Sequence, residues 1–163
     1  MRYPLAVNRI RRGLINNTFG LVRKNAQGEK KPHQGWDFEA RVGTPCYAVG
    51  AGVIHSTRDA GDYGLQVVLT LDAPHKGKPL HAFYAHLLSL DVHTGQRVAE
   101  GDQIGRTGES GNARGMPLDD QHLHFELRTE PTPGLGLGGR ISPFEVYKHC
   151  PLDAPVVQRA EVD

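Results

Sequence analysis

The chain has 163 residues, with 19 Lys and Arg against 18 Asp and Glu and a formal net charge of +1. This length suffices for one domain with a hydrophobic core but not for two comfortable ones, and the balanced charge offers no field of one sign to hold nucleic acid, so we expect no nucleic-acid partner. No run reaches the roughly 18 apolar residues of a membrane-spanning helix, so no membrane span is expected.

The composition and the first residues add to this picture. With 20 Gly and 11 Pro, the chain is expected to turn often, as β proteins with short strands do. Residues 1–12 carry basic side chains but no apolar segment or small-residue cleavage site, so they are not a secretory signal peptide. We therefore expect a protein that stays inside the cell, leaves it by another route, or derives from a longer precursor. Cys46 and Cys150 lie far apart and form no C-x-x-C pair, which leaves open a disulfide in an oxidising compartment or two free thiols.

The first third of the chain alternates between apolar and turn-forming residues. Residues 13–25 alternate apolar and polar side chains, which predicts one strand or two short ones. Residues 32–40 follow, where His33 and Asp37 stand four apart. The Pro and Gly of this segment argue against a helix, and positions i and i+4 share a face in a strand as well, so the two side chains should converge. Trp36 and Phe38 are expected in the core.

The middle of the chain predicts a series of strands. Residues 43–55 are a turn followed by a glycine-rich strand. Residues 63–71 and 80–87 alternate with a period of two and predict a hairpin with the polar loop 72–79. Residues 95–105 predict two very short strands joined by a tight turn, and a polar, glycine-punctuated loop follows.

The stretch 121–127 places two histidines in an apolar, strand-like run. Because side chains at i and i+2 point to the same face of a strand, His122 and His124 should share one side of a sheet. Two readings of such a pair are open from the stretch alone: metal ligands, or partly buried histidines satisfied by hydrogen bonds.

The last part contains a Pro/Gly loop at 129–139 and a single helical turn at 141–147, with Ser142 as cap and Pro143 at the first helical position. We therefore predict a mostly β fold: a single domain spanning residues 1–163 on an antiparallel sheet, with long loops and little helix. Residues 1–12 are an N-terminal extension and 150–163 a C-terminal tail.

A zinc site would account for the histidines. Hydrolytic zinc sites use three protein ligands and keep a fourth position open, and spare histidines beside the metal move protons. The candidate ligands are His33, Asp37 and one of His122 and His124, and the other member of that pair and His86 are spare. The H-E-x-x-H helix of other zinc peptidases is absent.

These motifs, in this order, resemble those of the lysostaphin-type (LytM-like) zinc metallopeptidases, which cleave peptide cross-bridges and stem peptides of bacterial cell walls. The family's H-x-x-x-D matches residues 33–37, its Y-A-H-L residues 84–87 and its H-L-H-F-E residues 122–126. Its glycine-spaced segment matches Gly95 to Gly108, and its S-x-F-G segment is similar to residues 17–20. The resemblance covers most of the chain and implies the peptidase fold of that family.

Carried over position by position, the resemblance implies that His33, Asp37 and His124 bind one Zn²⁺ per chain. It also implies that His86 and His122 are the catalytic pair, one assisting deprotonation of the attacking water and the other stabilising the tetrahedral intermediate. Which of the two is the base stays open, with His122 preferred.

Some positions depart from the family or have two interpretations. Tyr84 is either a donor to the oxyanion or a core residue, and Asn112 and Arg114 are candidates for contact with substrate. Residues 115–121 form a longer approach to the H-L-H motif than in many relatives, and the loop 72–79 is extended. Because specificity is usually carried by loops, we expect both segments to affect substrate choice.

The resemblance implies a monomeric zinc endopeptidase that acts on peptidoglycan peptides in the periplasm or cell wall, cytoplasmic before export. The absence of a signal peptide motivates the hypothesis of a secreted antibacterial effector with an immunity or inhibitor protein as partner. Two alternatives are an inactive LytM-like regulator of a cell-wall amidase and a lipoyl- or biotinyl-like carrier, suggested by Gly95 to Gly105. No lysine lies between Arg97 and Gly108 to carry such a group.

Overall fold

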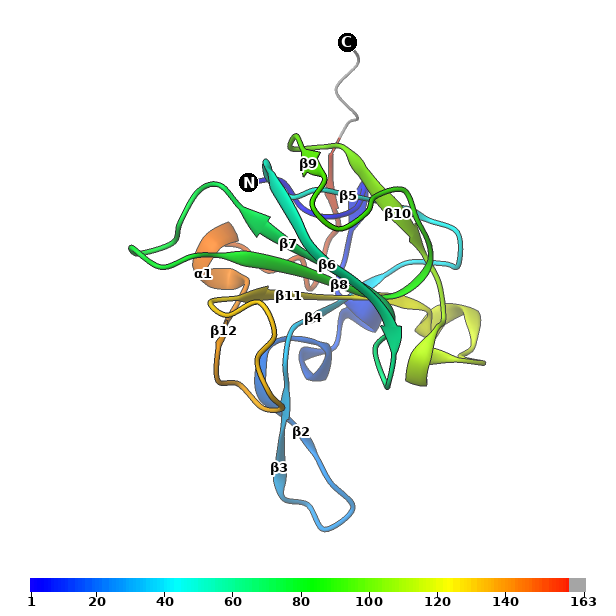
Figure 1. Cartoon of the computed structure of the whole chain (residues 1–163). Helices are drawn as coiled ribbons and strands as arrows, with labels where there is room; N and C mark the ends of the chain where they lie inside the picture. The colour runs from blue at the N-terminus through cyan, green and yellow to red at the C-terminus, as the bar shows by residue number, and fades with distance from the viewer. Residues whose placement is uncertain (159–163) are drawn as a thin grey trace.

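A computed structural model describes residues 1–158, and the last five residues of the predicted C-terminal tail lie outside the described part. An antiparallel sheet of nine strands dominates the molecule (Figure 1). Its strands are β4 (Trp36–Glu39), β5 (Pro45–Tyr47), β6 (Gly52–Ala60), β7 (Gly64–Leu71), β8 (His81–Leu90), β9 (Arg97–Val98), β10 (Gln103–Thr107), β11 (His122–Arg128) and β12 (Arg140–Ile141). The predicted fold class, mostly β with an antiparallel sheet and little helix, is confirmed.

The order of the strands brings distant parts of the sequence together. The main path runs β12-β11-β8-β7-β6-β9, while β4 pairs with β11, and β10 pairs with both β5 and β8. β7 and β8 form the predicted long hairpin, joined by residues 72–80. Because β11 pairs with β4 on one side and β8 on the other, the two histidine-bearing motifs upstream are brought beside the H-L-H strand.

Two smaller sheets complete the strands. β1 (Val7–Asn8) pairs with β13 (Val156–Val157), so the segments near the two ends of the chain pack against each other. β2 (Gly20–Lys24) and β3 (Lys30–His33) form a hairpin that projects from the body of the molecule (Figure 1). No helix within residues 1–158 is long and apolar enough to span a membrane.

Within residues 1–158, helical structure is confined to single turns. These are the 3-10 turns η1 (Arg11–Gly13), η2 (Ile15–Asn17), η3 (Gly111–Ala113) and η4 (Leu118–Asp120) and the α-helix α1 (Phe144–Tyr147). The predicted turn at 141–147 is present, although Pro143 stands just before the helix rather than at its first position, and Ser142 Oγ accepts the amide of Phe144 at 3.2 Å.

The strand predicted over 13–25 is wrong for its first half, where two 3-10 turns precede β2. Gly13 adopts a φ of +61°, which interrupts extended backbone. The side chains of Asn17 and Thr18 also bond to nearby carbonyls, Asn17 to Arg11 and Thr18 to Ile15. Such local bonds stabilise turns at the expense of a strand.

The core lies against the main sheet. Trp36, Phe38, Tyr84 and Phe125 are among its largest fully buried side chains, as predicted for Trp36 and Phe38. The two cysteines are free thiols, with Cys46 buried and Cys150 half-buried.

Candidate metal centre

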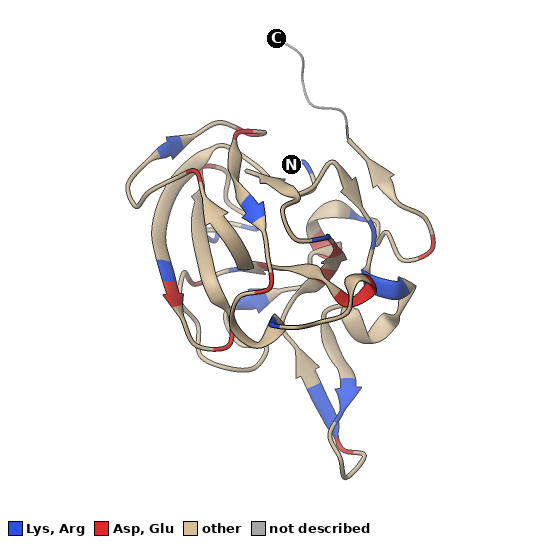
Figure 2. Ribbon diagram, turned by 90° about the vertical axis from the view of Figure 1, so that its right-hand side faces the viewer, with Lys and Arg blue, Asp and Glu red and all other residues tan. Residues whose placement is uncertain are grey.

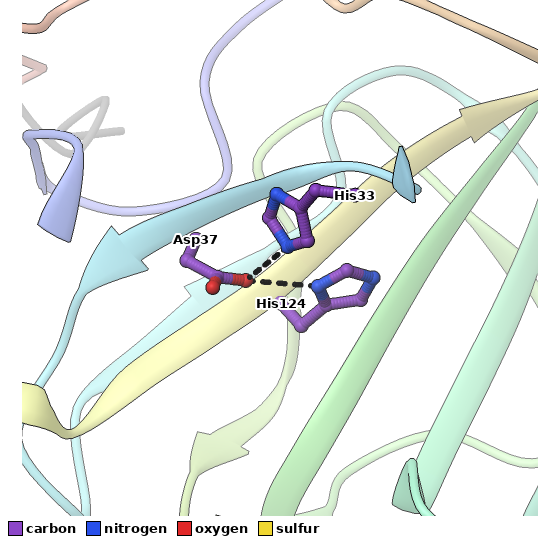
Figure 3. A group of neighbouring side chains, drawn as sticks. All are labelled: His33, Asp37 and His124. Carbon is purple, nitrogen blue, oxygen red and sulfur yellow. Dashed lines mark hydrogen bonds and ion pairs between the residues drawn. The ribbon is translucent and has the colours of Figure 1, made fainter. Parts of the chain in front are cut away.

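Three side chains from three strands meet beside β11. His33 ends β3, Asp37 lies in β4 and His124 lies in β11, where it is paired directly with Asp37 in the strand register. Asp37 Oδ1 lies 3.2 Å from His33 Nε2 and 2.8 Å from His124 Nδ1 (Figure 3). All three residues are buried, and their ligand atoms lie within 4.8 Å of one another.

A glycine bend makes this convergence possible. His33 and Asp37 stand on different strands, β3 and β4, so they converge across a bend and not along one strand as the spacing alone suggested. At the bend, a Cβ on Gly35 would lie 2.2 Å from the carbonyl oxygen of Phe125 in β11. Only glycine allows the backbone that carries both ligands to approach the H-L-H strand so closely.

Hydrogen bonds to the far ring nitrogens fix how the two histidines point. The Nδ1 of His33 lies 2.8 Å from the carbonyl oxygen of Thr18, to which it donates, so Nε2 faces Asp37. The Nε2 of His124 lies 2.9 Å from Oε1 of Glu126, so Nδ1 faces Asp37. Bonds of this kind hold metal-binding histidines in one tautomer and orientation.

Glu126 is itself held by a buried ionic network. Its side chain has no exposure, and its Oε2 accepts from Arg128 at 2.6 Å and from Arg140 at 2.8 Å. The hydroxyl of Tyr63 donates to Oε1 at 2.9 Å. Burial alone would raise the pKa of Glu126, but His124 and the two arginines lower it, so this carboxylate stays charged.

Two arginines hold the outer oxygen of Asp37. Arg11 Nη2 and Arg23 Nη2 each lie 3.0 Å from Oδ2, leaving Oδ1 directed at His33 and His124. Burial alone would raise the pKa of Asp37, yet the neighbouring histidines hold it well below the ordinary value. The ionised form of Asp37 is therefore favoured, and its Oδ1 faces the two histidines.

Asp37 and Glu126 also determine the pKa of His124. Burial disfavours its charged form, but the hydrogen bonds that it donates to Asp37 and Glu126 raise the pKa of His124 to about 9. Without a metal, a proton occupies the space between His124 Nδ1 and Asp37. A metal cation bound there would take the place of that proton, because metal ligation requires neutral imidazole.

The remaining two predicted site residues lie next to this cluster. His122 and His86 are both buried, with ring centroids 5.1 Å apart. Their Nδ1 atoms donate to the carbonyl oxygens of Asp120 at 2.9 Å and Ser110 at 2.8 Å, which leaves both Nε2 atoms free. His122 Nε2 lies 3.8 Å from Asp37 Oδ1, and so it faces the three-residue cluster.

Burial keeps both of these histidines neutral. It lowers the pKa of His86 to about 4, with further lowering from the neighbouring His122, and it also lowers the pKa of His122. His86 adopts a φ of +58°, a backbone conformation that is rare for non-glycine residues and that clusters at functional sites.

All five predicted site residues line one cavity of about 270 Å³. Sequence reasoning missed five polar side chains in its wall, namely Arg11, Arg23, Gln34, Asp62 and Tyr63. Of these, Tyr63 stands at the start of a predicted strand beside a glycine, while the others carried no signal that could have found them.

Three weaker expectations can be compared with the structure. Tyr84 is a core residue: its hydroxyl donates to the carbonyl of Tyr47 at 2.9 Å and accepts the amide of Val49, so it does not point at the cavity. Asn112 lines the cavity, whereas Arg114 lies in a separate surface hollow. From the extended approach 115–121, Met116 contributes to the wall.

The donor set fits zinc. Two imidazole nitrogens and one carboxylate oxygen are the ligands of open, hydrolytic zinc sites, and each ligand here is oriented by a second hydrogen bond. Among residues 1–158 this is the one cluster of His, Cys, Asp and Glu side chains close enough to hold a metal ion.

Comparisons with known proteins agree with this geometry. The model of peptidase family M23 matches residues 31–134. The chain is 36% identical over 132 residues to the peptidoglycan DD-endopeptidase ShyA of Vibrio cholerae, which covers 81% of this chain and 28% of that protein. It is 35% identical over 128 residues to the peptidoglycan DD-endopeptidase ShyC of the same organism, and the match covers 78% of this chain and 26% of that protein. The chain thus spans less than a third of the length of these relatives.

Solved structures are similar as well. A zinc-containing peptidase from Vibrio cholerae shares the fold with a TM-score of 0.64 and 29% identity, over 83% of this chain and 39% of that one. The catalytic domain of lysostaphin from Staphylococcus simulans has a TM-score of 0.63 and 25% identity, over 81% of this chain and 90% of that one. Together with the donor set, these findings confirm the predicted resemblance and the zinc cofactor.

Proposed function

The chain belongs to peptidase family M23, and from this membership and the geometry of its metal centre we propose that it is a zinc-dependent endopeptidase that hydrolyses peptides of bacterial peptidoglycan. One observation carries the proposal. The three-residue cluster and the free Nε2 atoms of two neutral histidines line the same cavity. Metal ligands and proton carriers are therefore within reach of a single bound peptide.

His33 Nε2, Asp37 Oδ1 and His124 Nδ1 are the proposed zinc ligands. When bound, zinc lowers the pKa of a water ligand toward about 7 and polarises the substrate carbonyl. The carboxylate of Asp37 supplies the negative charge that favours a cation here, and Arg11 and Arg23 hold it so that one oxygen is directed at the site.

His122 and His86 are the proposed catalytic residues. Each presents an unprotonated Nε2 to the cavity, because its Nδ1 proton is engaged by a carbonyl and burial keeps the ring neutral. His122 lies nearer the cluster, which supports it as the general base that accepts a proton from the attacking water. We propose that the proton taken up by His122 passes to Nε2 of His86, whose ring centroid lies 5.1 Å from that of His122, and that His86 then donates a hydrogen bond to the oxyanion.

Relatives support the substrate class. Two relatives, 36% and 35% identical to this chain, are named peptidoglycan DD-endopeptidases, and the motif residues that carry the resemblance line one cavity in this chain. Which peptide bond is cleaved depends on the cavity walls, to which Met116 of the segment 115–121 and Leu135 of the loop 129–139 contribute.

Incubating the purified protein with purified peptidoglycan of known cross-link type tests the proposal. We expect soluble peptides, detected by mass spectrometry, whose release stops with a zinc chelator and resumes on addition of zinc. Release that continues unchanged in the chelator would contradict the proposal, and so would the absence of released peptides from walls of every cross-link type.

The finer hypotheses concern the setting of the reaction. We propose action in the cell envelope, by a monomer, with the secreted effector role and its immunity protein as a further hypothesis. Expression of the chain directed to the periplasm tests the effector role: we expect lysis, rescued by a specific protein from the producing organism. The alternative of an inactive amidase regulator predicts instead no zinc and no peptide release, and a carrier module predicts a covalently modified lysine.

A further inference from the structure

The hairpin formed by β2 and β3 carries a cluster of positive charge directly beside the metal centre. It spans Gly20–His33, projects from the body of the molecule, and shows basic residues on both strands (Figures 1 and 2). Four basic side chains and one acidic one give it a charge of +3, against +1 for the whole chain. We call residues 20–33 the basic arm.

The arrangement of these charges is unfavourable within the arm itself. In the strand register Arg23 stands opposite Lys31, and Lys24 stands opposite Lys30. Like charges directly opposite each other destabilise a pair of strands, and a hairpin of two strands is marginally stable on its own. The lysines are exposed, and none of them forms an ion pair within residues 1–158. An anionic ligand would relieve this repulsion.

The arm is coupled to the active site at its base. β3 ends in the zinc ligand His33, and Arg23 reaches from β2 to Asp37 Oδ2 at 3.0 Å. Because directly opposed residues share a face of the hairpin, Lys31 lies on the same face as Arg23, and Arg23 and Pro32 line the cavity. A peptide that leaves the cavity along this face passes the lysine.

We propose that the basic arm binds free carboxylates of the peptide substrate outside the cavity. This inference rests on the proposed function, since peptidoglycan stem peptides carry such carboxylates. The ligand is a short anionic peptide and not nucleic acid, because three lysines on one hairpin of a nearly neutral chain form no extended track along a polyanion. Lys31 contacts the carboxylate nearest the cavity, and the Lys24 and Lys30 pair presents charge on the outer face.

A triple variant with a matched control tests the inference. The arm variant is Lys24→Gln, Lys30→Gln and Lys31→Gln; the control, Arg58→Gln, Arg106→Gln and Lys148→Gln, removes the same charge from exposed basic residues outside the arm and the loop 72–79. Each exposed ion pair between a lysine and a substrate carboxylate adds only a small part of the binding free energy. Loss of all three lysines should therefore raise KM for peptidoglycan peptides about tenfold and leave kcat nearly unchanged. The melting temperature of the arm variant should be equal or higher, because the repulsion is gone.

The chemistry of the ligand gives a second readout. Amidation of the substrate carboxylates should raise KM for wild type to the value of the arm variant and leave the arm variant unaffected, and salt should weaken wild type more than the arm variant. Equal KM values in the arm and control variants would overturn the inference. The inference would also be overturned if the arm variant had a higher KM than wild type on amidated substrate, or if the arm bound DNA in preference to the peptide.

Binding without turnover separates this inference from the proposed function. Co-sedimentation with insoluble peptidoglycan, measured for His122→Ala with and without the arm substitutions, needs no hydrolysis. If binding depends on the arm but wild type releases no peptides, the inference about the basic arm is supported and the proposed peptidase function is contradicted. Hydrolysis by wild type with arm-independent binding would do the reverse.

Discussion

Replacement of Glu126 by glutamine tests how the metal centre is held. Glu126 does not touch the proposed zinc position, but its Oε1 lies 2.9 Å from His124 Nε2 and so fixes which nitrogen of that ring faces Asp37. Glu126→Gln keeps the shape of the side chain and removes its charge. It leaves Arg128 and Arg140, both buried, without their shared carboxylate.

The structure sets the expected size of the effect. Removing one partner of a buried ion pair costs about 3–5 kcal/mol, and glutamine still accepts a hydrogen bond, so we expect a loss of about 3 kcal/mol in the free energy of unfolding. Loss of an outer partner to a ligating histidine lowers metal affinity by about 10-fold to 100-fold. We therefore expect both a less stable protein and weaker zinc binding.

Two measurements separate these effects. Urea denaturation of the zinc-free protein reports the stability change, and competition with a chromophoric chelator reports zinc affinity. Glu39→Gln is the matched control, since Glu39 is a partly exposed carboxylate on the adjacent strand that pairs with Arg9 at 2.9 Å, and its loss should change stability by about 1 kcal/mol or less. If Glu126→Gln matched this control in both measurements, the reasoning about the buried network would be refuted.

Three further predictions follow from single residues. The pKa of His86 is lowered to about 4, whereas an unfolded histidine has a pKa of about 6.5, so the unfolded state binds more protons between these values and the protein becomes less stable as the pH is lowered. Between pH 7 and pH 5, zinc-free wild type should therefore lose roughly 2 kcal/mol more of its free energy of unfolding than His86→Asn, measured by urea denaturation. Equal losses in the two proteins would contradict this. Gly35→Ala forces a Cβ against the carbonyl of Phe125 and should cost about 2 kcal/mol of stability, whereas Gly138→Ala, with open space around it, should cost little; equal melting temperatures would count against the role of the bend. Burial raises the pKa of the Cys46 thiol to about 12, so an alkylating reagent at pH 8 should modify it only in the unfolded protein, and rapid labelling of the folded protein, seen by mass spectrometry, would contradict its burial.

The strands and the grouping of five side chains could be predicted from the sequence because their signals are local, whereas the roles of these five residues stay predictions. Alternation along 63–71 and 80–87 predicts strands directly, and the H-L-H spacing places two histidines on one face. The resemblance assigned unequal roles to these two histidines. In the structure the two histidines have different partners: His124 presents Nδ1 to Asp37 and is held by Glu126, whereas His122 is held by a backbone carbonyl.

The rest could not be predicted because it depends on contacts between distant segments. Arg11 and Arg23 reach Asp37 only after η1 and β2 have packed beside β4, and nothing in their local sequence indicates this. Likewise, turns replace the first part of the strand, or two short strands, expected over 13–25, because side-chain bonds from Asn17 and Thr18 satisfy the backbone locally. The like-charge pairs of the basic arm become visible only once the register of β2 and β3 is known.

Zinc content measured alongside peptide release, in wild type, His33→Ala and His122→Ala, tests the central claim most directly. We predict one zinc per chain in wild type and His122→Ala, none in His33→Ala, and peptide release by wild type alone. Stoichiometric zinc in His33→Ala, or undiminished peptide release by His122→Ala, would contradict the division of the site into metal ligands and catalytic residues.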